Sequence, residues 1–162
     1  MKRHILSLIM IMGLLGCSDN DDDGINCELY DPAFPTLYLK FVDVNGNNLI
    51  ENGSIDPEVI SVEGEFPHAG FIFNPASEFA VPNADIRQLD NTIQLFIPKE
   101  SNFQYTIHLN DQDSILIDFT AELTRIPCDL SYYKPTGGVF KDVGFELTEV
   151  PPLQFLAVVE LQ

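Results

Sequence analysis

The feature that most constrains the fold is an alternation of apolar and polar residues, which recurs from Thr36 almost to the end of the chain. A period of two places successive side chains on opposite faces of a β-strand, whereas an α-helix requires a period of about 3.6. No stretch of this region fits the helical period better. In the clearest segment the apolar residues are Phe103, Tyr105, Ile107 and Leu109, and the polar residues between them are Gln104, Thr106 and His108. The pattern predicts an all-β protein.

A second alternating segment, residues 115–123, follows directly and predicts a β-hairpin with the first. Between them, Asn110-Asp111-Gln112-Asp113 has the composition of a turn. Both apolar sets can face one core only if the sequence positions of each two paired residues add up to an even number. A slip of one residue would turn every core side chain to solvent. We therefore expect a loop of odd length, Asp111 to Asp113, with Leu109 opposite Ile115.

Further alternating segments bring the expected number of short strands to about eight. They lie at residues 37–41, 60–62, 71–73, 93–97, 139–140, 144–150 and 153–161. The 11 prolines and 10 glycines fall mostly between them. This arrangement predicts an antiparallel β-sandwich, immunoglobulin-like or transthyretin-like. With 162 residues, of which 45% are hydrophobic, the chain is long enough for one such domain over residues 27–162.

Residues 1–16 have the organisation of an export signal. A cationic head with Lys2 and Arg3 precedes an apolar run from Ile5 to Leu15. The run has about 11 residues, whereas a helix that crosses a bilayer needs about 20. We therefore expect this segment to be a cleaved signal peptide and not a membrane anchor.

The signal ends in Leu14-Leu15-Gly16-Cys17, which resembles the lipobox of bacterial lipoproteins. The resemblance implies that the Cys17 thiol is diacylated and that this residue becomes the new N-terminus. More than one acyl chain is needed for stable attachment, and a lipoprotein N-terminus provides it. The alternative is an ordinary secretory signal followed by a coincidental cysteine.

The next residues, Ser18-Asp19-Asn20-Asp21-Asp22-Asp23, resemble the acidic export tag of surface-exposed lipoproteins of the Bacteroidota, from which Asn20 departs. The resemblance covers only the first 23 residues. It implies an outer-membrane lipoprotein that faces the cell exterior, with residues 17–26 as its lipidated tether. The bland alternative is a self-repelling spacer, which would also suit the periplasmic face of the membrane.

Two further cysteines, Cys27 and Cys128, form an even pair in a compartment that permits oxidation. We expect one disulfide between them. It would close a loop of about 100 residues, for which the chain-entropy model gives up to about 4.7 kcal/mol. The alternatives are two buried free thiols or a metal pair, although no histidines stand at ligand spacing beside them.

The charge of the chain limits its partners. The chain has 25 Asp and Glu against 8 Lys and Arg, which gives a formal charge of −17. Removal of residues 1–16 would change the charge to −19, because the charged residues in this segment are Lys2 and Arg3. Nucleic-acid binding depends on cationic side chains that neutralise phosphates, so nucleic acids are excluded as partners. Anionic lipid surfaces would repel the domain, so membrane attachment is expected through the N-terminal lipid alone.

Asp43, Asn45, Asn47 and Glu51 fall at positions 1, 3, 5 and 9 of a calcium-loop pattern, and oxygen ligands are what this cation requires. Position 6 is Asn48 where an EF-hand has glycine, and position 12 lacks the bidentate glutamate. Asn45-Gly46 is also a strong hairpin-turn signal. A hairpin turn is the main prediction here and a Ca²⁺ site the alternative; no other cofactor is expected.

Two other groups of residues are candidate sites. Tyr132 and Tyr133 are the best candidates for an aromatic contact with a glycan, in a chain that has no tryptophan, although such residues more often cap a core edge. Asp113-Ser114-Ile115 resembles the short acceptor motif at which Bacteroidota O-glycosylate exported proteins, and its expected place at a hairpin end would expose Ser114.

The chain contains no Gly-x-Ser-x-Gly elbow, no His-Glu-x-x-His motif and no glycine-rich phosphate loop. We therefore predict a non-enzyme: a cell-surface lipoprotein that acts as a binding or accessory module, docking on an outer-membrane protein. The first alternative is a glycan- or calcium-binding module. The second is a small hydrolase with a carboxylate pair, which only spacing in three dimensions would reveal.

Overall fold

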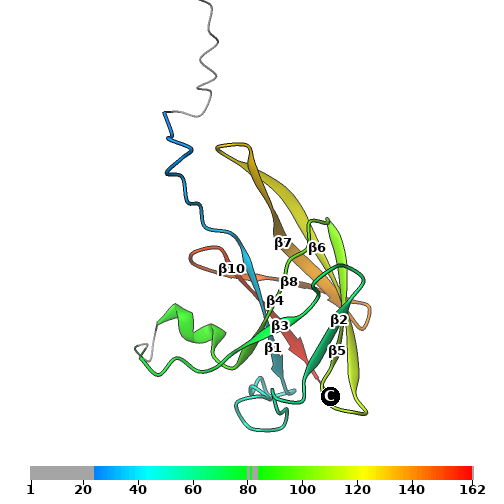
Figure 1. The fold of residues 1–162 in the computed structure, drawn as a ribbon. Helices are drawn as coiled ribbons and strands as arrows, with labels where there is room; N and C mark the ends of the chain where they lie inside the picture. Colours follow the sequence, from blue (N-terminus) through cyan, green and yellow to red (C-terminus); the bar gives the residue numbers. More distant parts are fainter. Residues whose placement is uncertain (1–23, 80, 82–83, 162) are drawn as a thin grey trace, which may run out of the picture.

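The computed structural model describes residues 24–79, 81 and 84–161. The expected signal peptide and Cys17 lie outside these residues. The described chain forms two five-stranded sheets that enclose one main hydrophobic core (Figure 1). The predicted β-sandwich is therefore confirmed.

Hydrogen-bonded neighbours set the order of the strands across each sheet, from one edge to the other. Sheet A contains β3 (Phe71–Asn74), β4 (Thr92–Leu95), β1 (Thr36–Val42), β10 (Gln154–Glu160) and β9 (Thr148–Val150). Sheet B contains β2 (Ser61–Gly64), β5 (Asn102–His108), β6 (Ser114–Ile126), β7 (Leu130–Phe140) and β8 (Val143–Glu146). One short 3-10 helix, η1 (Asp85–Leu89), precedes β4.

The topology differs from the prediction in two respects. The described residues form ten strands in place of about eight, and β1 with β10 is the one parallel pair among them. Parallel neighbours need a long crossover connection. Here β1 lies near the start of the domain and β10 near its end, so the rest of the domain forms that connection.

The main strand missed in the sequence covers residues 130–138, the first part of β7. Its proline and two glycines resemble strand breakers. In the structure the β6–β7 register shifts between Thr120 and Ala121, which leaves Thr136 as an extra residue beside Pro135. A bulge is one of the few positions in a strand where proline is tolerated, because the ladder is already interrupted there.

The hairpin formed by β5 and β6 confirms the predicted parity but not the predicted pairs. Ile115 lies opposite Ile107, two residues from the expected partner Leu109. The Asn110 side chain accepts a hydrogen bond from the backbone N–H of Asp113 at 2.8 Å, and the N–H of Leu109 donates to the Asp113 carbonyl at 2.8 Å. The three-residue loop therefore begins at Asn110, one residue earlier than expected, and Leu109 closes it by its bond to Asp113. As a result, each residue of β6 pairs with a residue of β5 two positions before the expected one.

An aromatic cluster lies at the centre of the core. Phe103 stacks on Phe119 with ring centroids 5.4 Å apart, and Phe66 packs edge-on against Tyr105 at 5.2 Å. All four side chains are buried. The Tyr105 hydroxyl donates a hydrogen bond to the backbone oxygen of Phe96 at 2.7 Å, which links β5 to the segment after β4. Burial raises the pKa of Tyr105, and this hydrogen bond opposes the rise only in part.

The segment 143–150 joins the two sheets along one side. Its first part, β8, pairs with β7 in sheet B, and its second part, β9, pairs with residues 154–156 of β10 in sheet A. Leu147 lies between the two parts and packs against the main core. The alternation that predicted one strand over 144–150 is thus continuous, but the strand changes sheets at its midpoint, as strands at the corners of sandwiches do.

Candidate functional site

The sandwich is elongated and its two ends differ (Figure 1). One end carries the Cys27–Cys128 disulfide and the turn between β6 and β7, and we call it the tether end. The opposite end carries loop 43–60, the β5–β6 turn at 109–113 and Leu161, and we call it the free end. The first described residues lie at the tether end and the C-terminus lies at the free end (Figure 1).

The tether end is closed by the predicted disulfide, which is present. Cys27 and Cys128 are 101 positions apart in sequence, and their Cα atoms lie 5.5 Å apart. The bond fastens the segment before β1 to the β6–β7 turn. A second contact lies nearby, where the Phe34 ring packs edge-on against Tyr132 with centroids 6.2 Å apart.

Tyr132 and Tyr133 lie in β7 and therefore point to opposite faces of sheet B. Tyr133 packs against the main core, whereas Tyr132 contacts Phe34. Both side chains are partly buried. The two rings cannot form one flat platform for a sugar, so any glycan contact would involve Tyr132 alone. The glycan site stays a prediction.

The next residue, Lys134, ties the two sheets together. Its ammonium group lies 3.2 Å from a carboxylate oxygen of Glu149 in β9 and 5.2 Å from the ring centroid of Phe155 in β10. An exposed ion pair of this kind contributes at most about 1 kcal/mol. The sequence carried no signal for this cross-sheet contact, because β7 was not expected to reach that far.

A shallow depression at the free end gathers segments that are distant in sequence. Residues of the 49–55 loop and of the 109–115 turn line it together with Lys141 and Leu161. Ser114 is exposed at its border, as its expected place at a hairpin end requires. Modification of Ser114 stays a prediction.

The carboxylate of Asp43 organises the loop that was considered as a calcium site. One of its oxygens accepts hydrogen bonds from the backbone N–H groups of Asn45 and Asn47, both at 2.8 Å, and the other accepts one from the Asn47 side chain at 2.8 Å. These bonds lower the pKa of Asp43, the bond from the Asn47 side chain most of all. Val42 and Asn48 form an antiparallel bridge across the loop, so the segment is a hairpin turn.

Glu51 lines a shallow hollow together with Asn47 and Lys40. It acts on Lys40, whose pKa is lowered by burial and partly restored by Asp90 and Glu51. Asn48 is engaged elsewhere, since its side-chain nitrogen donates to the Asn91 carbonyl at 3.0 Å. Within the part of the chain that the structure describes, no group of three or more His, Cys, Asp or Glu side chains is placed to hold a metal ion.

No family model, no curated protein and no solved structure matches this chain.

The sequence did not predict a second depression, which runs along the side of the sandwich and which we call the wedge. It is lined by Phe140, Lys141, Val143 and Phe145 of the β7–β8 hairpin and by residues 158–160 of β10. It lies between β8, which pairs with β7, and the part of β10 that β9 does not cover. Lys141 lines both the wedge and the depression at the free end, so the two hollows adjoin.

Gly138 determines how closely Phe145, which lines the wedge, approaches β7. A Cβ atom at this position would lie 2.5 Å from the Phe145 ring and 2.6 Å from the backbone oxygen of Asp118. The absence of a side chain therefore allows Phe145 to lie across β7, where its ring packs edge-on against Phe119 at 5.9 Å. Two adjacent glycines in a strand are a sequence signal for such a close approach.

Among the helical residues of the described ranges, no helix is long and apolar enough to cross a membrane.

Proposed function

We propose that this chain is a lipoprotein, attached to the outer membrane through acylated Cys17 and facing the cell exterior, whose sandwich is a non-catalytic binding or accessory module for a partner at the cell surface. The observation that supports this proposal best is the position of the disulfide. Ten residues after the expected anchor, Cys27 is bonded to the far turn of the β6–β7 hairpin.

This geometry orients the domain. Ten extended residues span at most about 35 Å, so a lipid on Cys17 would keep the tether end close to the membrane. The free end would then point away from the bilayer, together with the depression at Ser114 and one end of the wedge. A domain held at one end presents its other end and its sides to partners, which is the arrangement that a binding module needs.

The shifted pKa values support structural roles for the groups concerned. Burial affects Tyr105 and Lys40, and turn hydrogen bonds affect Asp43. Catalytic acids and bases are recognised when a shifted pKa coincides with a shared cleft. Tyr105 lies in the core and Asp43 is occupied by its own turn, so these shifts favour a scaffold over a catalyst.

Mass spectrometry of the natural chain, purified from membranes in detergent, tests the anchor. We expect residues 1–16 to be absent and Cys17 to carry acyl chains. A matched Cys17→Ala chain should leave the membrane fraction. An intact leader or an unmodified thiol on Cys17 would overturn the proposal.

The orientation needs a separate measurement. A peptide epitope appended at the C-terminus, which belongs to the free end, should bind antibody on intact cells. An epitope that becomes accessible only after the outer membrane is permeabilised would place the domain on the periplasmic side.

A further inference from the structure

Half of β10 has no strand on its outer side. β1 pairs with β10 along residues 154–160, but β9 covers only residues 154–156 on the other edge. Among the described residues, no strand pairs with the outer edge of residues 157–160. The chain that would continue the line of β9 is β8, and it pairs with β7 instead.

The backbone hydrogen bonds show which groups this open edge presents. The Leu153 carbonyl accepts from Thr36, and the Leu161 N–H donates to Val42, so residues at odd positions point their backbone groups towards β1. Backbone groups alternate in direction along a strand of a sheet. The N–H and C=O groups of Val158 and Glu160 therefore point outwards, into the wedge, where an added strand can bind them.

The walls beside these groups are largely apolar. Val143 is 68% exposed and Val158 is 45% exposed, and the ring of Phe145 forms part of the floor. Lys141 extends over the Phe140 ring, with its nitrogen 5.1 Å from the centroid. Strand addition needs two elements: backbone groups that bind the main chain of the added strand, and a surface that contacts every second side chain of that strand. The unpaired edge of β10 provides the first, and the exposed valines beside it provide the second.

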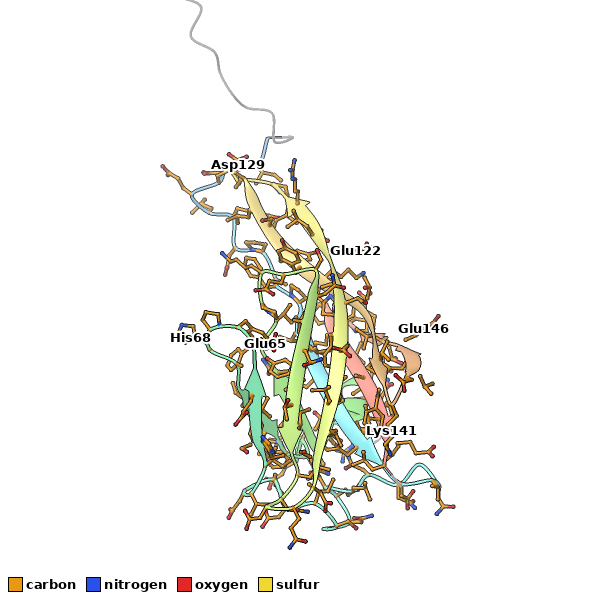
Figure 2. The ribbon with its side chains drawn as sticks, turned by 90° about the vertical axis from the view of Figure 1, so that its right-hand side faces the viewer. Glu65, His68, Glu122, Asp129, Lys141 and Glu146 are labelled. Carbon is orange, nitrogen blue, oxygen red and sulfur yellow. A yellow bond between two sulfur atoms is a disulfide. The ribbon has the colours of Figure 1, made fainter. Side chains whose placement is uncertain are left out.

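Acidic residues surround this opening. Glu160 and Lys141 line it, and Asp142 and Glu146, which neighbour lining residues of the β7–β8 hairpin in sequence, are exposed. Figure 2 shows Lys141 and Glu146 on the same side of the molecule. Since the whole chain has a formal charge of −17, a cationic segment is attracted to the wedge, whereas a second copy of this chain is repelled.

We propose that the wedge binds an extended segment of a partner protein, with alternating apolar and basic residues, which adds to sheet A as a strand antiparallel to β10. This inference rests on the binding role proposed above and specifies the partner. A residue opposite Val159 would point inwards, over Phe145. A basic residue opposite Glu160 would complete an opposite-charge cross-strand pair.

The probe is a blocked synthetic peptide of alternating valine and lysine, added to the full chain labelled with ¹⁵N in a neutral detergent. We expect saturable NMR shifts at the amides of Val158, Glu160 and Val143, with slowed exchange of the Val158 and Glu160 amides. A peptide of alternating valine and glutamate is the matched control and should leave these amides unchanged. Shifts spread over the acidic surface, without the β10 amides, would show non-specific attraction and overturn the proposal.

Val158→Pro gives the sharpest variant. It removes an N–H that points into the wedge and leaves the β1–β10 ladder intact, because proline is tolerated where the lost donor faces away from the sheet. We expect a loss of peptide affinity of up to about tenfold, as the loss of one main-chain hydrogen bond produces. Unchanged affinity in this variant would refute strand addition.

Glu160→Lys provides an independent test should the proline variant fail to fold. It should weaken binding of the lysine peptide and favour the glutamate peptide, and an unaltered preference would contradict the proposed pairing.

Sedimentation of the unmodified chain tests whether a second copy of the chain binds in the wedge instead. A dimer that Val158→Pro dissociates would replace the partner segment by a second copy. Failure of all these binding tests would leave the acylation and orientation measurements unaffected.

Discussion

The β6–β7 hairpin is stabilised by different interactions in its two halves. On the sandwich side of the bulge at Thr136, Phe119 is 1% exposed and stacks on Phe103. On the tether side, Leu123 of the same strand is 49% exposed, and the disulfide closes the end of the hairpin. Packing in the core holds the body half. The part beyond the bulge, which we call the extension, is held by the disulfide and by a few contacts of Tyr132, Tyr133 and Lys134. A long hairpin can thus project beyond its core when its turn is fastened to another segment.

The largest test of this comparison is a matched pair of truncations in β6. Phe119→Ala should lower the free energy of unfolding by about 3–5 kcal/mol, because a large buried ring leaves a cavity. Leu123→Ala should cost no more than about 0.5–1 kcal/mol, since half of its side chain already contacts solvent. Denaturant unfolding monitored by circular dichroism measures both. Equal costs would show that the extension is packed as tightly as the body.

Removal of the disulfide should have the next largest effect. The double variant Cys27→Ser with Cys128→Ser should lose about 2–4 kcal/mol, because the unfolded chain regains the freedom of a loop of about 100 residues. Amide hydrogen exchange should accelerate most in residues 122–132, none of which is buried. Uniform acceleration across β5 and β6 would contradict an extension that opens separately from the body.

A glycine pair sharpens the comparison within the body half. Gly138→Ala should cost about 1–3 kcal/mol, because the new methyl group meets the Asp118 backbone and the Phe145 ring, and the backbone cannot move aside freely. Gly144→Ala is the matched control, since its Cβ would lie 3.9 Å from the nearest backbone atom. Thermal unfolding of the two variants gives the difference. A cost for Gly144→Ala as large as that for Gly138→Ala would remove close packing as the explanation.

Much of the fold could be predicted because alternation is a local signal. Phe103 to Leu109 and residues 115–123 formed the expected hairpin with the expected parity. The register required knowledge of a hydrogen bond from Asp113 to the Asn110 side chain, which composition does not reveal. The missed part of β7 contains Pro135, which a strand accepts only beside a bulge, and a bulge depends on the partner strand.

The candidate sites were harder to predict for the same reason. The disulfide was predicted from the even number of cysteines that remain after Cys17 and from the expected compartment. Asp43 was recognised as part of a hairpin turn, because turn bonds are local. The wedge joins Lys141 to Glu160 across two sheets and depends on where the segment 143–150 changes from one sheet to the other. No pattern within either segment contains that information.

The pairing of β1 with β10 makes sheet A dependent on a strand that is synthesised more than a hundred residues after β1. Neighbouring strands β5 to β8 can pair as each emerges, because only short turns separate them. The inner strand β1 has no partner on its β10 side until residue 154 and its successors exist. A nascent chain would therefore keep a buried strand exposed to aggregation until β10 has been made, and a stop codon before β10 would make that exposure permanent.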